Sequence, residues 1–390
     1  MMSSLRATYP FRHTPLQIIH VIGNFLRIWS VYSMYRYLIQ TGSSVGLFIF
    51  CCLLPSSLLF LAMQKPWKGR PLSNQQVVPS IINGVITALY FSMWGKGLKS
   101  CGPVRTILAE YAGAVLGVLS AALYGQGKHL WKKVGGLVAM MLSFYLLSRG
   151  WAMGTHSPFD ILFCSKLNLK LRSKENLDAE AHPEEILGMK DMIVPIIAGI
   201  LSALRRVIAR RVSLKNQLKR RLHAITITSA TCFLFPVAMW DFITVSDDSQ
   251  IWQFLILKSI LLFLIGCVLL TGAIQGSTSD STSQLPFSAW AFGSFILFGV
   301  ILVFYVDSIA EERLHMVFSS PRHLMVAGGC MIILEIFYQM DFSLPGFLLC
   351  CIILGFGIYE ATALERGKKG TQHFDSPEEM LDDMKSPLPT

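Results

Sequence analysis

The sequence has few charged residues and lacks the short motifs of common enzymes. Of its 390 residues only 15% are charged, whereas 53% are hydrophobic and the mean hydropathy is +0.51. It contains no Gly-rich phosphate loop, no nucleophile elbow and no HExxH motif. This composition is not that of a soluble enzyme, so it predicts an all-α polytopic membrane protein and no catalytic residues.

Metal ligands in a usable arrangement are scarce as well. The nine cysteines show no CxxC spacing, and most lie in or beside apolar runs, where they read as small core residues. No His-rich loop occurs, and the single His-xxx-Asp pair, His156 and Asp160, has Pro158 between its members. A proline there prevents one helical face from presenting both side chains. We therefore expect no metal site and no cofactor.

Long apolar runs dominate what is present. A helix needs about 20 residues to cross the hydrocarbon core of a bilayer, and most of these runs reach that length. A weaker first run contains Arg27, and we expect it to span too, although it could lie in the interface as an amphipathic helix. The predicted spans cover residues 15–38, 44–63, 77–98, 103–125, 134–150, 189–209, 222–244, 286–306, 322–339 and 343–364.

Basic residues predict how the chain is oriented. The net charge of +10 is best explained by cytosolic loops that face anionic lipid, and nucleic-acid binding is not expected. The largest basic group follows the span 189–209 and reads as a membrane-surface anchor. It comprises Arg205, Arg206, Arg210, Arg211, Lys215, Lys219, Arg220 and Arg221. With this group in the cytosol, the N-terminus falls on the cytosolic side of the membrane, and the C-terminus does so as well if residues 251–275 do not span.

One further apolar run, residues 251–275, makes the span count ambiguous. Hydropathy alone favours a span, but a span would move the basic residues that follow it to the non-cytosolic side. Those residues are Arg313, Arg322, Arg366, Lys368 and Lys369. We therefore expect an insertion, 248–276, that lies flat, re-enters or packs aside, and ten spans in total.

The ten spans divide into two sets of five. The predicted parts are a cytosolic N-terminus (1–14), a first repeat (15–150), a polar loop (151–188), a second repeat with the insertion (189–364) and a disordered cytosolic tail (365–390). An odd number of spans per repeat makes the repeats inverted, which is a frequent transporter layout. The layout looks like the drug/metabolite transporter fold, which includes nucleotide-sugar carriers.

Two acidic residues inside apolar spans are the candidate site. Glu110 shares a helix face with Gly113, and Glu335 shares one with Gly328. A carboxylate facing lipid costs several kcal/mol, so each should face the interior, as a proton- or substrate-binding group or in a buried helix–helix hydrogen bond. Further candidates for binding a substrate are Asn83 and Arg105. For close helix packing the candidates are the pairs Gly113–Gly117 and Gly199–Ala203.

Three short strings carry a resemblance to a known family. They are Gln64–Lys65–Pro66, then Cys101–Gly102–Pro103 with Arg105–Thr106, and finally Phe304–Tyr305–Val306–Asp307–Ser308–Ile309. Together, over residues 45–370, the chain resembles the extended N-terminal membrane region of long-form zinc transporters of the cation diffusion facilitator superfamily. Similar plant proteins are called metal tolerance proteins. The resemblance implies a place in Golgi or endoplasmic-reticulum membranes.

The zinc site of that family lies in a C-terminal module, which has no counterpart in this sequence. We therefore expect a protein accessory to zinc transport that does not carry zinc alone, and that could pair with a separate zinc-transporting subunit. A drug/metabolite-type carrier of a small organic or nucleotide-sugar solute is the alternative. A further alternative is an inactive truncated or spliced form.

Overall fold

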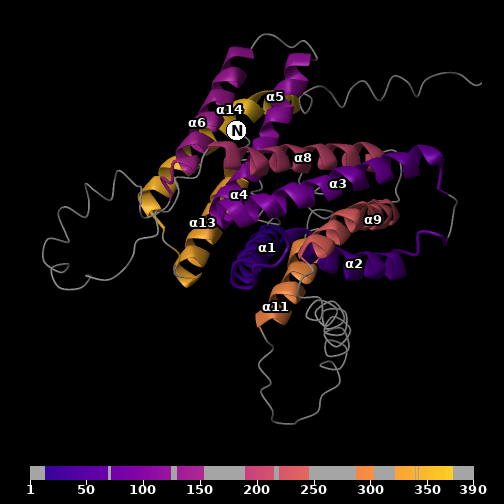
Figure 1. Cartoon of the computed structure of the whole chain (residues 1–390). Coiled ribbons are helices and arrows are strands. Elements are labelled where there is room, and N and C mark those ends of the chain that lie inside the picture. Colours follow the sequence, from indigo (N-terminus) through magenta and orange to yellow (C-terminus); the bar gives the residue numbers. More distant parts are fainter. Residues whose placement is uncertain are drawn as a thin grey trace, which may run out of the picture.

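The computed structural model describes residues 14–68, 72–123, 130–152, 189–214, 219–245, 287–302, 321–338, 340 and 342–371. Within these ranges every regular element is a helix (Figure 1). The elements are α1 (Thr14–Thr41), α2 (Val45–Gln64), α3 (Asn74–Cys101), α4 (Pro103–Ala109), the 3₁₀ turn η1 (Glu110–Gly113), α5 (Ala114–Leu123), α6 (Leu130–Ser148), α8 (Met189–Leu214), α9 (Lys219–Val245), α11 (Phe287–Ser294), the π-helical η4 (Phe295–Ile301), α13 (Pro321–Tyr338) and α14 (Leu344–Thr371).

Five helices of the described chain are long and apolar enough to cross a membrane. Their spanning parts are Val45–Gln64, Asn74–Cys101, Met189–Ala209, Arg220–Asp241 and Leu344–Ala361. Two shorter apolar helices cover Trp290–Ile301 and His323–Tyr338. The prediction of an α-helical membrane protein is thereby confirmed, while the ten-span inverted repeat stays a prediction.

Apolar side chains cover the outside of the bundle as well as its inside. Ile336 and Phe337 are each 71% exposed, while Tyr32 and Phe48 are almost completely buried. Water-soluble proteins rarely expose such large apolar areas without a partner to cover them. Hydrocarbon is the environment in which an outer surface of this kind is stable.

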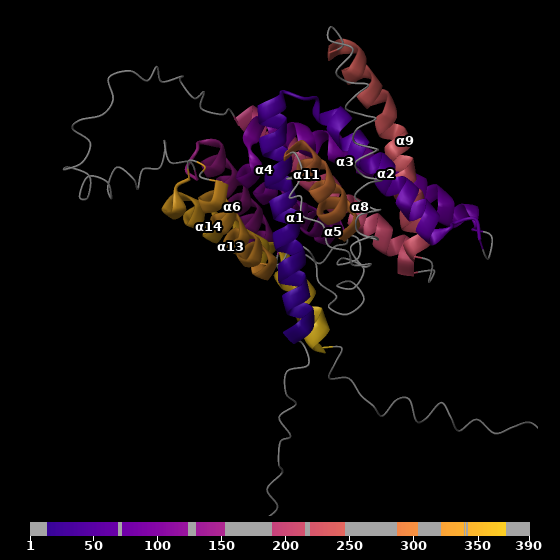
Figure 2. The same ribbon diagram turned by 90° about the horizontal axis from the view of Figure 1, so that it is seen from below.

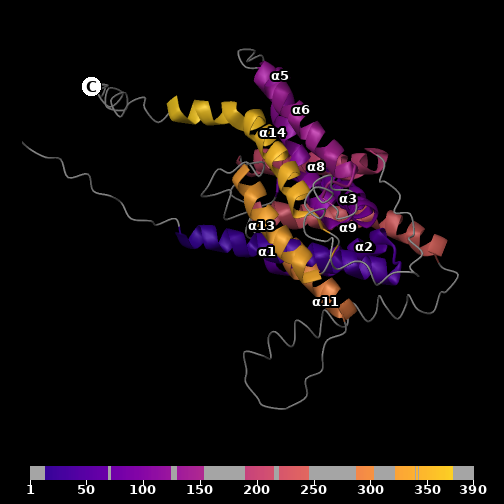
Figure 3. The same cartoon turned by 90° about the vertical axis from the view of Figure 1, so that its left-hand side faces the viewer.

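The helices form two groups with α1 between them. α3 packs along α8 and α9, and α2 packs on α9, whereas α6 packs along α14. α1 contacts α11 and η4 on one side and α13 on another. Figures 1 and 2 show α6, α13 and α14 on one side of α1, with α2, α3 and α9 on the other. Figure 3 shows α13 crossing α1. α1 therefore links the two groups.

Local sequence signals account for several helix ends. Ser73 and Gln76 form a capping box at the start of α3. Oγ of Ser73 accepts a hydrogen bond from the backbone N–H of Gln75, and Oε1 of Gln76 accepts one from the backbone N–H of Ser73. Pro103 opens α4, where its missing N–H costs nothing. Gly102, just before it, has a φ of 81°, which glycine adopts without strain.

Glycines allow the long helices to approach each other closely. A Cβ added at Gly84 of α3 would lie 2.5 Å from Cβ of Ser229 on α9. On α6 and α14, a Cβ at Gly136 would lie 2.8 Å from the carbonyl oxygen of Gly357. Without a hydrophobic effect between helices inside lipid, such close van der Waals packing supplies much of the association energy.

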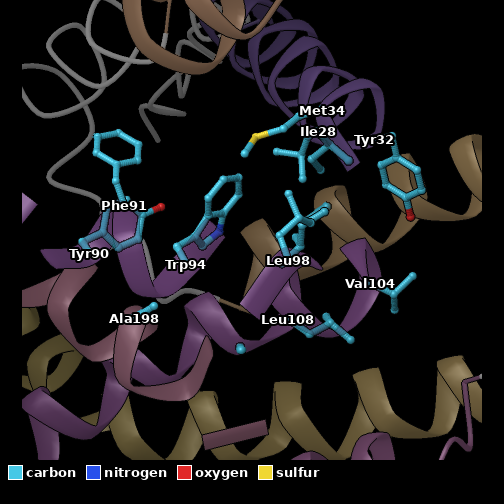
Figure 4. Packing of buried hydrophobic residues seen from close by; sticks show 14 of the residues in the cluster. Ile28, Tyr32, Met34, Tyr90, Phe91, Trp94, Leu98, Val104, Leu108 and Ala198 are labelled. Carbon is cyan, nitrogen blue, oxygen red and sulfur yellow. The ribbon is translucent and has the colours of Figure 1, made fainter. Parts of the chain in front are cut away.

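The buried core between the two groups is largely aromatic and aliphatic. Figure 4 shows Trp94 and Leu98 of α3 on the side of Met34 and Ile28 of α1, with Tyr90 and Phe91 about one turn earlier on α3. Aromatic residues bury large areas, and their rings interact at the separations seen between Tyr90 and Trp94, whose centroids are 6.3 Å apart.

The structure differs from the sequence-based expectations in several places. The segment 103–125, expected as one continuous helix, is interrupted by η1, which begins at Glu110. The segment 286–306 contains a π-helical stretch, Phe295–Ile301. α14 continues to Thr371, past residue 364, where we expected the disordered tail to begin. The insertion 248–276, the His156–Asp160 pair and the Phe304–Ile309 string lie outside the described residues.

Candidate functional site

Glu110 faces the bundle interior, as its sequence position predicted. It lies at the first position of η1 and forms an ion pair with Arg27, which is near the middle of α1. The side chains of Arg27 and Glu110 are 23% and 8% exposed. The hydroxyl of Tyr90, on α3, donates a second hydrogen bond to Oε1 of Glu110 at 3.2 Å. Side chains from α1 and α3 thus meet at the carboxylate of η1.

Two arginines of α8 complete the surroundings of Glu110. The guanidinium of Arg205 lies 4.8 Å from the ring centre of Tyr90 and 5.9 Å from that of Phe91. Arg206 interacts electrostatically with Glu110 and donates a hydrogen bond to Oγ of Ser202 at 3.0 Å. We had expected both arginines in the membrane-surface anchor. They instead pack against the interior, because the α8 face that carries them lies against α3 and η1.

The rest of the predicted basic anchor is divided. Arg220 is exposed at the start of α9, whereas Arg221 donates a hydrogen bond to the carbonyl oxygen of Pro66 in the link after α2. That bond holds the start of α9 against the end of α2. The side chains of Arg210, Arg211 and Lys219, and the whole of Lys215, lie outside the described part of the chain, so their membrane-surface role stays a prediction.

Glu335 is the second interior acid and has a different partner. It is 3% exposed on α13 and accepts a hydrogen bond of 2.5 Å from the hydroxyl of Tyr32 on α1. One turn later on α13, the hydroxyl of Tyr338 accepts from Nε1 of Trp29 at 3.1 Å. The rings of Tyr32 and Tyr338 are stacked with centroids 5.7 Å apart. Hydrogen bonds donated by the aromatic side chains Trp29 and Tyr32 therefore join α1 to α13.

We expected Glu110 and Glu335 to form one site, but the structure places them on different sides of α1. Their partners Arg27 and Tyr32 are five residues apart on that helix. At 3.6 residues per turn, this spacing directs the two side chains about 140° from each other. Each acid therefore belongs to its own interface of α1, one toward η1 and the other toward α13.

The remaining predicted site residues are buried at other positions. Arg105 is 8% exposed on α4 and interacts electrostatically with Cys101. Asn83 is 5% exposed on α3, and its Oδ1 has no hydrogen-bond partner among the described residues. Asn83 and Tyr90 are seven residues apart on α3, about two turns, and so lie on roughly the same face. Substrate binding by these residues stays a prediction.

The small residues expected at helix contacts pack against each other. A Cβ added at Gly113 of η1 would lie 2.6 Å from Cβ of Ala203 on α8. A Cβ added at Gly199 would collide with the carbonyl oxygen of Ala109, which directly precedes Glu110. Gly113, Gly199 and Ala203 thus lie where η1 and α8 approach each other closely. The surroundings of Gly117 lie outside the description.

Sequence reasoning missed the partners of the two acids. Arg27 was visible as a charge inside an apolar run, and such a charge needs a counter-charge in lipid. Its partner lies 83 residues away, however, so nothing in the local pattern pairs them. Tyr32 and Tyr90 were indistinguishable from ordinary core aromatics. Only their hydroxyl groups, once placed by the fold, show which helices they join.

Among the residues that the structure describes, no group of three or more His, Cys, Asp or Glu side chains comes together. The polar side chains in contact with Glu110 and Glu335 are instead a guanidinium and two phenols. Comparison with protein-family models and with curated proteins gives no match to this chain.

Proposed function

We propose that the chain is an accessory membrane protein of zinc transport in Golgi or endoplasmic-reticulum membranes, with both termini in the cytosol. In this role it does not carry zinc by itself, and it assists a separate zinc-transporting subunit of the cation diffusion facilitator type. The resemblance of its three sequence strings to long-form zinc transporters supports this proposal, and so do its five helices of spanning length.

The surroundings of Glu110 carry the part of the proposal that concerns zinc. A transported zinc ion needs several N, O or S ligands in roughly tetrahedral array. Glu110 is already paired with Arg27, and Arg206 also acts on it electrostatically. These guanidinium charges repel a divalent cation that approaches the same carboxylate. Glu110 therefore serves better as a brace between helices than as a zinc ligand.

Zinc uptake into reconstituted vesicles tests this function. Vesicles are prepared with the chain alone, with a zinc-transporting subunit alone and with both, and a trapped fluorescent indicator reports zinc entry. We expect no uptake above that of empty vesicles for the chain alone, and faster uptake for the pair than for the subunit alone. Uptake by the chain alone would contradict the proposal, as would a pair no faster than the subunit.

Charged residues inside the bundle favour a second candidate, a drug/metabolite-type carrier. Interior ionisable residues often mark a solute pathway. Arg27 and Glu110 form an ion pair inside the bundle, and Tyr90, which is bonded to Glu110, lies near the middle of the spanning helix α3. A carrier that uses Glu110 would lose transport of its organic solute in a Glu110→Gln variant. An accessory protein carrying the same variant would still assist zinc uptake, provided that the variant folds.

A further inference from the structure

The helices α2 and α9 form an antiparallel pair that a side-chain hydrogen bond fixes at each end (Figure 1). At one end, the hydroxyl of Ser44 donates a hydrogen bond of 2.5 Å to Oδ2 of Asp241. At the other end, Arg221 donates one to the carbonyl oxygen of Pro66. The 20 residues of α2 between these contacts span about 30 Å, which is the thickness of the hydrocarbon core of a bilayer. The two ends of the pair therefore match the two surfaces of a membrane.

An exposed tryptophan lies at each end of this pair. Trp67 follows the end of α2 and is 66% exposed, and Trp240, near the end of α9, is 70% exposed. Tryptophan is enriched at both membrane–water interfaces, because its ring is largely apolar while its N–H is polar. Two exposed tryptophans, one at each end of a span, indicate where the two headgroup layers lie.

The end that carries Trp67 is basic. Lys65 and Lys68 are exposed in one turn, in which the backbone N–H of Lys68 donates a hydrogen bond to the carbonyl oxygen of Lys65 at 2.8 Å. Arg220 is exposed as well, and the bond from its neighbour Arg221 to Pro66 holds the start of α9 against this turn. None of the side chains of Lys65, Lys68 and Arg220 forms an ion pair with a residue that the structure describes. We call Lys65, Trp67, Lys68 and Arg220 the basic end.

The charges nearest to Trp240 are of both signs. Asp241 follows Trp240 directly. On the same side of the bundle, Nζ of Lys99 donates hydrogen bonds of 3.1 Å to the carbonyl oxygens of Gly42 and Ser43, in the link that leads into α2. This end of the pair therefore has an equally exposed tryptophan without the one-sided charge of the basic end.

We propose that the basic end is a binding surface for the headgroups of anionic phospholipids. Lysine and arginine side chains near a span extend their charged groups to the headgroup layer while their methylene groups stay in apolar surroundings. Basic groups beside spanning helices attract anionic lipid in this way. The basic anchor predicted from the sequence included Arg220, but neither of the lysines nor Trp67. This inference does not depend on an accessory role in zinc transport, and its test contains no zinc, so the two proposals fail separately.

The test measures quenching of tryptophan fluorescence by brominated lipids, which act only at short range. The full chain is placed in phosphatidylcholine vesicles that contain, in both leaflets, the same fraction of brominated phosphatidylserine or of brominated phosphatidylcholine. The difference between the unchanged chain and Trp67→Phe gives the quenching of Trp67. We expect phosphatidylserine to be enriched about fivefold near Trp67, the ratio that corresponds to the attraction of about 1 kcal/mol between one basic residue and an anionic surface. Equal quenching of Trp67 by the two lipids would overturn the proposal.

Trp240 is the matched control. The same difference, taken with Trp240→Phe, should show equal quenching by the two brominated lipids, because the charges nearest to Trp240 are of both signs. A preference for phosphatidylserine as large at Trp240 as at Trp67 would overturn the proposal, since the overall charge of +10 would then explain both.

Removal of the charges tests the cause of the preference. In a chain with Lys65→Gln, Lys68→Gln and Arg220→Gln, quenching of Trp67 by brominated phosphatidylserine should fall to that by brominated phosphatidylcholine. Quenching by brominated phosphatidylcholine should stay unchanged, which shows that Trp67 keeps its place in the membrane. In the unchanged chain, about 1 M salt should lower the preference without any substitution, because it shortens the screening length to about 3 Å. A preference that survives removal of the three charges would overturn the proposal.

Discussion

The two interior acids show how different two carboxylates in similar sequence settings become after folding. Glu110 lies on a 3₁₀ turn, pairs with Arg27 and interacts electrostatically with Arg206 of α8. Glu335 lies on a regular helix and is bonded to the neutral phenol of Tyr32. The surroundings of Glu110 are therefore ionic, whereas those of Glu335 are aromatic. Neighbouring helices, rather than the flanking residues, decide how each acid can act.

The largest effect should come from Arg27→Gln, which leaves Glu110 without its ion-pair partner. Breaking a buried ion pair by removing one member costs about 3–5 kcal/mol, and the arginines of α8 should hold the loss to the lower end of that range. The free energy of unfolding in detergent micelles measures the effect. Arg36→Gln is the control, because Arg36 is exposed on the same helix.

The double variant Arg27→Gln with Glu110→Gln should recover part of that loss, because it leaves no carboxylate without its counter-charge at position 110. An Arg27 variant no less stable than the Arg36 control would show that the ion pair between Arg27 and Glu110 contributes nothing to stability. The contrast between the two acids would then disappear.

Gly199→Ala should have the next largest effect, about 1–3 kcal/mol, because its Cβ collides with the carbonyl oxygen of Ala109 and displaces the turn that carries Glu110. Gly329→Ala, on the helix that carries Glu335, is the control, since a Cβ there meets nothing within 4 Å. Alanine is the better helix former, so we expect the control to match or exceed the parent in melting temperature. Equal melting temperatures for the two variants would refute the close contact.

Tyr32→Phe removes the donor that satisfies Glu335, and we expect a loss of about 1–2 kcal/mol, smaller than for Arg27→Gln, since the broken bond is not an ion pair. Unfolding of the variant is compared with that of Tyr145→Phe, whose phenol is 43% exposed. A loss larger than that of Arg27→Gln would show that the hydrogen bond to Glu335 stabilises the fold more than the ion pair of Glu110.

The smallest effect should come from Glu335→Gln, within about 1 kcal/mol of the parent chain, because an amide oxygen still accepts the hydrogen bond from Tyr32. Glu110→Gln should cost more in the same unfolding measurement, since it removes the counter-charge of Arg27. If both variants proved equally stable, the charge of Glu110 would have no structural role.

Much of the helical architecture followed from apolar periodicity and run length. Pro103 marked the start of α4 correctly, and Gly113, Gly199 and Ala203 marked a close contact, because backbone approach requires small residues wherever it occurs. The change to 3₁₀ geometry at Glu110 could not be predicted from the residues of this span. A change from α-helical to 3₁₀ geometry costs little locally, so tertiary packing against α8 is free to select it.

Composition and the spacing of apolar runs determined that this chain is a helical membrane protein with its acids directed inward, because the cost of exposing charge to hydrocarbon applies wherever the residue lies in a span. Only the tertiary structure decided that Arg205 and Arg206 join the interior, that Glu110 pairs with Arg27, and that Glu335 pairs with Tyr32. These pairings depend on which helices become neighbours and how each is rotated. That choice is made by packing across the whole bundle, and no local stretch of sequence contains it.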